Sequence, residues 1–583
     1  MTTFTELQAQ MTGPGGPFET QTEVIDTGLG EVEMTMYAQR FGDLRQVAQF
    51  AALAHGDKEF IVYGDRRITF AEFFAQANTI SAALLAAGVV KGDRVAVLSQ
   101  NNPEWCLTFW ATVNIGAVLV GLNGWWTTDE ILYGLEDSGA KVLVVDSKRF
   151  TRIATEINNI DTLERVYLVD VDPGESGSTS AKVHAFSELL ASSDGPAPDP
   201  TVELDEGDHA VIFYTSGTTG RPKGAISTHR SMIANLQNTV FLITATTAII
   251  NEKSAAAGGE PPETPTQPVA LFTSPLFHVS GCHSTLVVGS LGGLKLVMIK
   301  GKFTPEGALQ LISDERVTTW STVPTMIWRT CEHPDRHEYD TSTVTAVAFG
   351  GSPSADELQR RIRETFPNVK GTSNAYGLTE TSSVATVLHG DAALTKADSV
   401  GLPVPTVRIA ISDGRGGLAE QGATGEVLIG GPVLMAGYWN KPEATAKAIQ
   451  DGWLYTGDVG HIDEDGYLFI TDRAKDMIIR GGENIYCVEI ENCLVEHEAI
   501  ADAAIVGVPH EGLGEEVKAF IELAPGASLT ADEVQGWVAK HLAPFKVPTY
   551  VEFIDGKLPR NASGKLLKNV LRGEGDVSFQ ETM

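Results

Sequence analysis

Apolar and polar positions alternate along the chain in blocks that predict strands and helices in turn. Glu59–Tyr63 and Arg66–Ile68 flank Gly64-Asp65, a pair typical of a hairpin turn between two strands. Thr69-Phe-Ala-Glu72 is a capping box, and apolar residues at helical spacing follow it until Gly88. Further strands are predicted at Arg94–Leu98, Ala117–Leu122, Lys141–Val145 and Val166–Val169, with helices near Pro103–Ile115 and Thr128–Asp137. This alternation indicates an α/β fold with a largely parallel sheet covered on both faces.

Two polar stretches and one change of character divide the chain. Asp172–Thr201 is rich in Ser, Gly, Pro and Asp and is expected to be a loop or linker. Asn251–Pro268 is similar, and we expect a surface insertion there, with a lid over the active site as the alternative. After Asp472 a compact unit of about a hundred residues follows, the usual size of one domain. Its predicted elements are helices near Cys487–Leu494 and Thr530–Leu542 and strands at Ala503–Val508, Val517–Leu523 and Tyr550–Ile554.

These patterns predict three parts. Residues 1–44 should form a loosely held N-terminal extension, residues 45–472 a large α/β domain, and residues 473–583 a smaller α+β domain. The length of 583 residues agrees with more than one domain.

Composition and charge narrow the possible partners. With 43% hydrophobic and 20% charged residues the chain is globular rather than disordered. Its net charge of −32 argues against binding to nucleic acid or to anionic lipid. Residues 1–30 lack the pattern of a signal peptide, and the apolar stretch Leu107–Leu122 is too short to span a bilayer, so we expect a core helix and strand there and no transmembrane segment. The five cysteines form no pairing pattern and are expected to be reduced thiols of a cytoplasmic protein.

The stretch Tyr214–Gly224, Tyr-Thr-Ser-Gly-Thr-Thr-Gly-Arg-Pro-Lys-Gly, follows the apolar run Ala210–Phe213. Closely spaced glycines let consecutive backbone N–H groups point toward one anion, and such a concavity binds phosphate. Lys223 adds a positive charge, and hydroxyl donors come from Thr215, Ser216, Thr218 and Thr219, with Gly217 and Gly220 between them. A surface turn is the alternative for a Gly-rich stretch alone, but the preceding strand, the hydroxyls, the Arg-Pro-Lys-Gly run and a following helix favour phosphate binding. Pro222 before the lysine excludes a Walker A loop.

Six further motifs stand in a fixed order after this stretch. Taken singly, each could be an ordinary turn or a solvated side chain. They are Phe349-Gly-Gly-Ser352, Asn374-Ala-Tyr-Gly-Leu-Thr-Glu-Thr381, Trp453-Leu-Tyr-Thr-Gly-Asp458, Asp472-Arg-Ala-Lys-Asp476, Gly481-Gly-Glu-Asn-Ile485 and Leu558-Pro-Arg-Asn-Ala-Ser-Gly-Lys565. Together with Tyr214–Gly224 they resemble the signature of the adenylate-forming superfamily, which includes acyl-CoA synthetases, aryl-CoA ligases, carrier-loading adenylation domains and luciferases. The resemblance covers about residues 45 to 572.

The resemblance implies a nucleotide site in the large domain. Tyr376 would stack on adenine, Thr379 would lie near the α-phosphate, and Glu380 with Thr215 would hold Mg²⁺, a cation that prefers one or two carboxylates plus substrate phosphates. Asp458 would bind the ribose hydroxyls with Arg473 as its partner. Residues expected to lie against the adenine and the acyl group are Gly350, Gly351, Ser352, Ala375 and Gly377.

The resemblance also implies that the small domain is mobile and delivers a catalytic lysine. Lys565 matches the adenylation lysine of the family, and Lys475 matches the hinge between the two domains. Gly481 and Gly482 would line the passage for pantetheine, where a side chain would narrow the tunnel. His278 would gate the path between the acyl pocket and the incoming thiol, although a histidine on an apolar segment is more often a core residue.

The activity implied is ATP-dependent synthesis of an acyl-CoA from a small carboxylic acid, with ATP, Mg²⁺ and coenzyme A as cofactors. Ser280 and Gly281 stand where hydroxycinnamate-specific relatives tend to carry an aromatic residue, and the glycines of the expected pocket suggest room for an acyl chain. We therefore expect a medium- or long-chain fatty acid. Aromatic or steroid-derived acids, a carrier-protein acceptor and an inactive nucleotide-binding relative are the alternatives. The oligomeric state is open, with a homodimer as one option, and Trp125-Trp126 is expected to pack at the surface or in the core.

Overall fold

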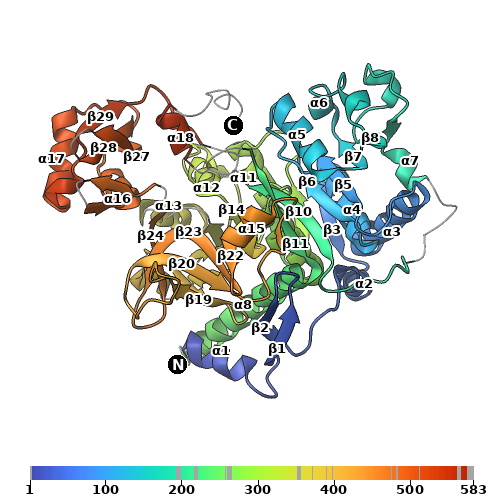
Figure 1. Cartoon of the computed structure of the whole chain (residues 1–583), viewed down its shortest axis with the longest axis horizontal. Helices are drawn as coiled ribbons and strands as arrows, with labels where there is room; N and C mark the ends of the chain where they lie inside the picture. The colour runs from blue at the N-terminus through green and yellow to red at the C-terminus, as the bar shows by residue number, and fades with distance from the viewer. Residues whose placement is uncertain are drawn as a thin grey trace.

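A computed structural model shows a large α/β region and a smaller C-terminal domain (Figure 1). It describes residues 3–191, 199–215, 221–256, 258, 266–350, 356–369, 372–388, 390, 392–396, 398–473, 476–480, 483–510, 513–560 and 566–573. The α/β class and the smaller second domain agree with the prediction from the sequence.

The first sheet has eight strands in the order β21-β11-β10-β6-β5-β7-β8-β9. Its five pairings from β10 to β9 are parallel, as the alternation of strands and helices predicts, and β11 runs antiparallel to β10 and β21. The strand bounds are β5 (Arg94–Leu98), β6 (Val118–Gly121), β7 (Val142–Val145), β8 (Arg165–Leu168), β9 (Val183–Ala185), β10 (His209–Thr215), β11 (Lys223–Thr228) and β21 (Gly437–Tyr438). The carboxyl ends of its parallel strands share one edge of the sheet, which is where ligands bind in open α/β folds.

The second sheet has fourteen strands and changes from parallel to antiparallel at β16. Its bounds are β3 (Glu59–Tyr63), β4 (Arg66–Thr69), β12 (Val269–Phe272), β13 (Lys295–Met298), β14 (Thr319–Thr322), β15 (Ala346–Gly350), β16 (Thr372–Tyr376), β17 (Thr386–Leu388), β18 (Ser399–Pro403), β19 (Arg408–Ile411), β20 (Gly425–Gly430), β22 (Ile449–Gln450), β23 (Trp453–Ile462) and β24 (Leu468–Arg473). The antiparallel half brings β23 beside β24, which pairs with β18 and so connects to the end of β16.

Helices fill the space between the two sheets. The predicted capping box at Thr69 begins α3 (Phe70–Ala86), and Asn102 caps α4 (Pro103–Asn114). Every residue of α4 except Glu104 is buried, because the helix is surrounded by apolar side chains from both sheets. The core helix and strand predicted within Leu107–Leu122 are confirmed. Other helices of the large region are α2 (Leu44–His55), α5 (Thr128–Ser138), α6 (Ser147–Phe150), α9 (Val279–Gly281), α10 (Val288–Leu291), α11 (Pro305–Asp314), α12 (Pro324–Cys331), α13 (Asp356–Thr365), α14 (Ala392–Thr395) and α15 (Pro442–Ala448).

The N-terminal extension is not loosely held, so that prediction is wrong. It forms α1 (Phe4–Thr12) and the hairpin of β1 (Thr20–Asp26) and β2 (Glu31–Tyr37), which lie against α8 (His229–Ala256) in Figure 1. The rings of Phe4 and Phe18 pack edge-on against Phe241 of α8, with centroids 6.0 and 5.5 Å away. Tyr37 donates a 2.8 Å hydrogen bond to the buried side chain of Asn238. The apolar residues of α1 find their partner on a helix more than two hundred positions later, so no local pattern reveals the contact.

Two predicted loops contain regular structure. Within Asp172–Thr201, β9 extends the first sheet and α7 (Ser187–Leu190) buries Leu189 against α3 and its neighbours. α8 continues through Ala256, so the first residues of the insertion predicted at Asn251–Pro268 are helical. The first proline of that stretch, which would interrupt a helix, is Pro261. Among the described residues α8 is the one helix whose length and hydropathy would let it cross a membrane, and 39% of its most apolar window is buried inside the protein.

The C-terminal domain has its own sheet and core. β27 (Ile500–His510) and β28 (Gly514–Leu523) form a long antiparallel pair, and β29 (Tyr550–Phe553) joins β28 in parallel. α16 (Cys487–Val495) and α17 (Ala531–His541) pack their apolar faces against this sheet. β25 (Ile478–Arg480) and β26 (Glu483–Ile485) complete the sheet, and α18 (Lys568–Leu571) follows it. The five cysteines of the chain are buried and form no disulfide with one another.

Candidate active site

The two ends of the glycine-rich stretch lie on paired strands, with Thr215 at the end of β10 and Lys223 at the start of β11. Thr215 and Lys223 are opposite each other in the antiparallel ladder, and the Thr215 hydroxyl lies 3.4 Å from the Lys223 carbonyl. The buried strand predicted at Ala210–Phe213 is confirmed as part of β10. The helix that follows the stretch is α8, which begins at His229 after Lys223–Thr228 has paired as β11. The turn itself, Ser216, Gly217, Thr218, Thr219 and Gly220, lies outside the described residues.

Both ends of this stretch are tied to α5. The Tyr214 hydroxyl donates to Asp137 Oδ2 at 2.9 Å, and the Tyr133 hydroxyl donates to the Pro222 carbonyl at 3.1 Å. Asp137 also forms an ion pair with Lys441 at 2.9 Å. Burial, and then the nearby Asp137 carboxylate, raise the pKa of Tyr214 well above its usual range, so the phenol stays protonated and remains a donor. The carboxylate of Asp137 therefore anchors the start of the predicted phosphate loop.

Tyr376 and Asp458 meet across the second sheet. Tyr376 ends β16, Asp458 lies on β23, and the phenol donates a 2.7 Å hydrogen bond to Asp458 Oδ2. Asp458 is 3% exposed and stands opposite Arg473 in the pairing of β23 with β24. The side chain of Arg473 is not described. Gly350, at the end of β15, pairs with Ala375 in the adjacent strand. The backbone thus brings together the residues that the sequence predicts around an adenosine.

Glu380 sits on a sharp turn that only glycine at position 377 permits. A Cβ on Gly377 would lie 1.5 Å from the Ser383 carbonyl oxygen. Ser382 and Ser383 both have positive φ angles, 50° and 120°, which are strained for residues other than glycine. Thr379–Thr381 forms one turn of 3₁₀ helix, so Glu380 does not open an α-helix.

Neighbouring segments hold this turn in place. His283, which is buried in the helical segment Cys282–Val287, has its Nδ1 3.0 Å from the Ser382 carbonyl oxygen. Ser284 and Ser383 share a 2.6 Å hydrogen bond between their hydroxyls. These contacts join the turn that carries Glu380 to the segment that follows His278.

Tyr438 contacts both Glu380 and Lys223. The sequence did not predict it as a site residue. Its hydroxyl donates to Glu380 Oε1 at 2.7 Å, and Lys223 Nζ lies 4.9 Å from the centroid of its ring. Tyr438 belongs to the two-residue strand β21, which pairs with β11. No hydrophobic pattern or charge marks this position, because its role comes from the pairing of two distant strands.

His278 begins the short helix α9 and carries no ion pair among the described residues. Burial lowers its pKa to about 4, so the imidazole is neutral at pH 7. Its Nδ1 lies 3.5 Å from the Ser280 hydroxyl. A Cβ on Gly281 would lie 2.2 Å from the Pro275 carbonyl oxygen. Glycine is therefore required at position 281 by the backbone, and the expectation that it signals room for an acyl chain is wrong at this position.

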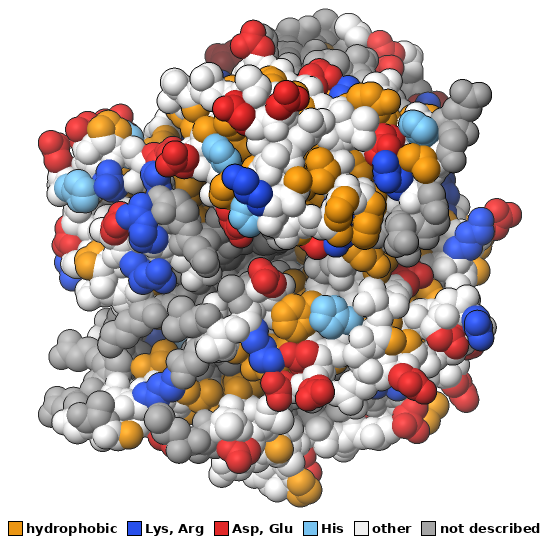
Figure 2. Space-filling model, turned by 90° about the vertical axis from the view of Figure 1, so that its left-hand side faces the viewer, with side chains coloured by type: hydrophobic (Ala, Val, Ile, Leu, Met, Phe, Trp, Pro, Cys, Tyr) orange, Lys and Arg blue, Asp and Glu red, His pale blue; other side chains and the backbone are white. Residues whose placement is uncertain are grey.

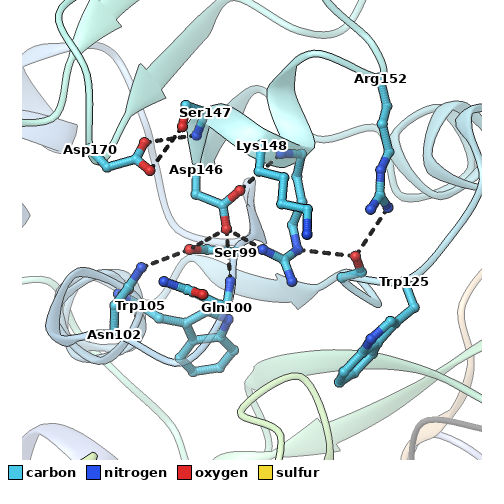
Figure 3. Close-up of polar contacts among 12 residues, drawn as sticks. Ser99, Gln100, Asn102, Trp105, Trp125, Asp146, Ser147, Lys148, Arg152 and Asp170 are labelled. Atoms are coloured by element: carbon cyan, nitrogen blue, oxygen red, sulfur yellow. Dashed lines mark hydrogen bonds and ion pairs between the residues drawn. The ribbon is translucent and has the colours of Figure 1, made fainter. Parts of the chain in front are cut away.

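A polar cluster at the carboxyl ends of β5 and β7 fixes the loop before α5 (Figure 3). Asp146 accepts hydrogen bonds from the backbone N–H of Gln100 at 2.9 Å and from Arg149 at 2.5 Å. Arg149 and Arg152 both donate to the Gly124 carbonyl, at 3.0 and 3.1 Å. Trp125 points away from the cluster, is 37% exposed and packs edge-on against Phe277, beside His278.

Trp126, by contrast, is a core residue. It is 5% exposed and packs edge-on against Tyr214, with ring centroids 5.5 Å apart. The expected surface or core packing of the Trp125-Trp126 pair is therefore confirmed for both rings.

The side chains present suit a magnesium ion bound mainly through phosphates. Glu380 offers one half-buried carboxylate, and Thr215 offers a hydroxyl beside Lys223. In the part of the chain that the structure describes, no group of three or more His, Cys, Asp or Glu side chains could hold a metal ion by itself. One carboxylate and a hydroxyl fit the oxygen preference of Mg²⁺.

Several predicted residues fall outside the described part of the chain. These are Gly351, Ser352, Lys475, Gly481, Gly482 and Lys565. Figure 2 shows the side of the molecule that carries the C-terminal domain, where Lys and Arg side chains lie among Asp and Glu side chains on the described surface.

Comparison with known proteins gives one consistent family. The model described as "AMP-binding enzyme" matches residues 48–439, and that described as "AMP-binding enzyme C-terminal domain" matches residues 489–565. Feruloyl-CoA synthase of Amycolatopsis sp is 35% identical over 515 residues, covering 88% of this chain and 94% of the relative. Long-chain-fatty-acid–CoA ligase of Bacillus subtilis is 32% identical over 559 residues, covering 91% and 94%. The solved structure of a Mycobacterium tuberculosis fatty acyl CoA synthetase is 30% identical, with a TM-score of 0.68 and coverage of 91% and 98%.

Proposed function

The chain belongs to the AMP-binding enzyme family and is an AMP-forming acid–thiol ligase, and we propose that its acid is a fatty acid of medium or long chain. The relatives named for fatty acids support this, and so does Ser280 at a position where an aromatic residue would suit a hydroxycinnamate. The feruloyl-CoA synthase supports an aromatic acid as the competing choice.

The first half-reaction has to overcome charge repulsion. A carboxylate oxygen attacks the α-phosphorus of ATP, the bond to the pyrophosphate oxygen breaks, and acyl-AMP forms. We assign Lys223 and the amides of the β10–β11 turn to the departing pyrophosphate. Glu380 and Thr215 would hold Mg²⁺, which, when bound, neutralises phosphate charge. The observation that carries this assignment is the convergence of Lys223 and Glu380 on Tyr438.

The nucleoside end has its own pair. The proposal assigns adenine to the ring of Tyr376 and the ribose hydroxyls to Asp458, whose contact in the ligand-free protein keeps both side chains oriented. A group oriented before the substrate arrives loses less entropy when it binds. Thr379, Gly350 and Ala375 would complete this end of the site.

The second half-reaction needs room for a thiol. CoA sulfur attacks the acyl carbonyl carbon, AMP leaves with the bonding electrons, and the thiol proton is lost to solvent. His278 would gate this path, and its neutral state at pH 7 lets it move without breaking an ion pair. We assign Lys565 to the carboxylate and α-phosphate in the first step. The small domain would then turn about Lys475, so that Gly481 and Gly482 face pantetheine.

A panel of carboxylic acids, scored by pyrophosphate release with and without CoA, tests the proposal. Burying one methylene contributes about 0.8 kcal/mol, so kcat/KM should rise roughly three- to fourfold for each CH₂ until the pocket is filled. A preference for ferulate over every fatty acid would overturn the choice of acid. Pyrophosphate release without any CoA-thioester product would point instead to a carrier-protein acceptor, and no release at all to an inactive nucleotide-binding relative.

A further inference from the structure

The side chain of Tyr438 contacts two opposite charges in this site. The Tyr438 hydroxyl holds Glu380 Oε1 at 2.7 Å, while the Lys223 ammonium lies over the ring face, 4.9 Å from its centroid. Both charged residues are within the described part of the chain, and there they form no ion pair with each other. A lysine and a glutamate that share a neighbour would ordinarily pair directly, because the ion pair is stronger than either contact with a neutral phenol.

A second tyrosine shows that a ring beneath a lysine does not by itself prevent pairing. Lys396 Nζ lies 4.8 Å from the ring centroid of Tyr467, yet the same ammonium forms ion pairs with Asp463 and with Asp465, the latter at 2.9 Å. The difference at Tyr438 is its hydroxyl, which binds the carboxylate. Tyr438 therefore contacts Glu380 through its hydroxyl and Lys223 through its ring.

The backbone around Tyr438 is fixed on three sides. β21 pairs with β11 so that Tyr438 stands opposite Ala225, two residues after Lys223. The Trp439 N–H donates to the Gly224 carbonyl at 2.7 Å. The Met435 N–H donates to the carbonyl of Glu380 itself at 2.8 Å. The segment thus locates the hairpin that carries Lys223 and the turn that carries Glu380 relative to one another.

Resting on the function proposed above, we propose that Tyr438 is a positioning residue that keeps Lys223 and Glu380 from neutralising each other before the nucleotide binds. The hydroxyl occupies Oε1 and leaves the second carboxylate oxygen for the metal. The ring holds the ammonium by a contact that a phosphate displaces easily, since a charged phosphate oxygen is a better partner than a π-face. Without Tyr438, ATP and Mg²⁺ would have to break an ion pair first.

The first test is carried out on the whole chain without nucleotide. Thermal midpoints are measured for Lys223→Met, Glu380→Gln and the double variant, each with Tyr438 intact and with Tyr438→Leu. With Tyr438 present, the effects of Lys223→Met and Glu380→Gln on the thermal midpoint should add. With leucine at position 438, Lys223 and Glu380 should form an ion pair, so the two effects should no longer add. Additive effects in both backgrounds would overturn the proposal. If Tyr438 only stabilises the fold, Tyr438→Leu should lower every thermal midpoint equally and leave the additivity of the two substitutions unchanged.

The second test measures binding of a non-hydrolysable ATP analogue with Mg²⁺ by calorimetry. Tyr438→Phe keeps the ring and loses the hydroxyl, so affinity should fall about threefold, and Tyr438→Leu should cost about tenfold. Tyr467→Leu is the matched control and should bind as the unaltered protein does. Unchanged affinity in Tyr438→Leu would overturn the proposal, whereas absence of binding in the unaltered protein would count against the proposed function instead.

Discussion

The phenol of Tyr376 donates a 2.7 Å hydrogen bond to the buried carboxylate of Asp458, 82 positions later in the chain. Each residue was predicted separately, the first for adenine and the second for ribose, and the fold brings their side chains into direct contact. Hydrogen bonds to a charged acceptor contribute about 1.5–3 kcal/mol.

Tyr376→Phe should therefore raise KM for ATP about tenfold, since Asp458 loses the hydrogen bond that it accepts from Tyr376. Asp458→Ala should cost more, because the ribose contact disappears as well. Pyrophosphate-release kinetics at varied ATP measure both effects. Tyr550→Phe, on an exposed strand of the C-terminal domain, is the control. An unchanged KM for ATP in both site variants would contradict the adenosine assignment.

Asp137→Ala should weaken ATP binding from a distance. The substitution removes the acceptor of Tyr214 and the partner of Lys441, and it leaves the start of the β10–β11 turn unanchored. We expect a loss of about 1–3 kcal/mol in stability from the unpaired groups, together with a higher KM for ATP. Glu136→Ala, one position earlier and exposed, should change neither quantity. Equal KM values for the two variants would show that this anchor does not matter.

Gly377→Ala should destabilise the protein strongly or prevent folding, because the new methyl group would overlap the Ser383 carbonyl. Gly536→Ala is the matched control: this glycine lies inside α17 with nothing within 4 Å of the added Cβ, and the change should stabilise the helix by about 0.5–1 kcal/mol. Thermal unfolding of both variants measures the contrast. Equal midpoints would refute the tight turn at Glu380.

Lys565→Ala should abolish acyl-adenylate formation while thioester formation from supplied acyl-adenylate survives. The loss should be about 10²–10³ in rate, the usual effect of removing one preorganised charge contact. Equal loss in both half-reactions would contradict the role of Lys565.

Lys475→Pro should have the reverse effect, because it obstructs the hinge. It should spare pyrophosphate release and reduce the output of CoA ester.

Stability should fall as the pH drops from 6.5 toward 4. Burial lowers the pKa of His229 and of His283 to about 4, from an ordinary value near 6.5. Below 6.5 the unfolded chain binds these protons and the folded chain does not, so the stability present at neutral pH is lost progressively, up to about 3 kcal/mol for each histidine. His283→Gln should flatten the curve of thermal midpoint against pH, and His541→Gln, on the surface, should not. A curve equally steep in His283→Gln would show that this histidine is not the source.

Much of this protein could be predicted without coordinates because the signals are local. Thr69-Phe-Ala-Glu72 caps a helix, the run at Ala210–Phe213 forms a strand, and the ordered motifs from Tyr214 to Asp458 identify the family, as the matches to the AMP-binding models confirm. Such signals depend on neighbours within about one or two turns of chain. Periodicity could not assign β9, because the strand has only three residues within a polar stretch and only Val183 among them is buried.

The contacts between distant segments are a property of the folded chain alone. Docking of Phe4 on Phe241, the anchor at Asp137 and the place of Tyr438 between Lys223 and Glu380 each join residues that only strand order and helix packing bring together. Gly281 is a further example. Its sequence context suggested an open pocket, but in the folded chain the Pro275 carbonyl oxygen occupies the space that a Cβ at this position would need. Local pattern decides which elements form, because it acts through short-range backbone and burial preferences. Topology decides which side chains meet, because pairing between strands far apart in the chain sets the distances over which hydrogen bonds and charges act.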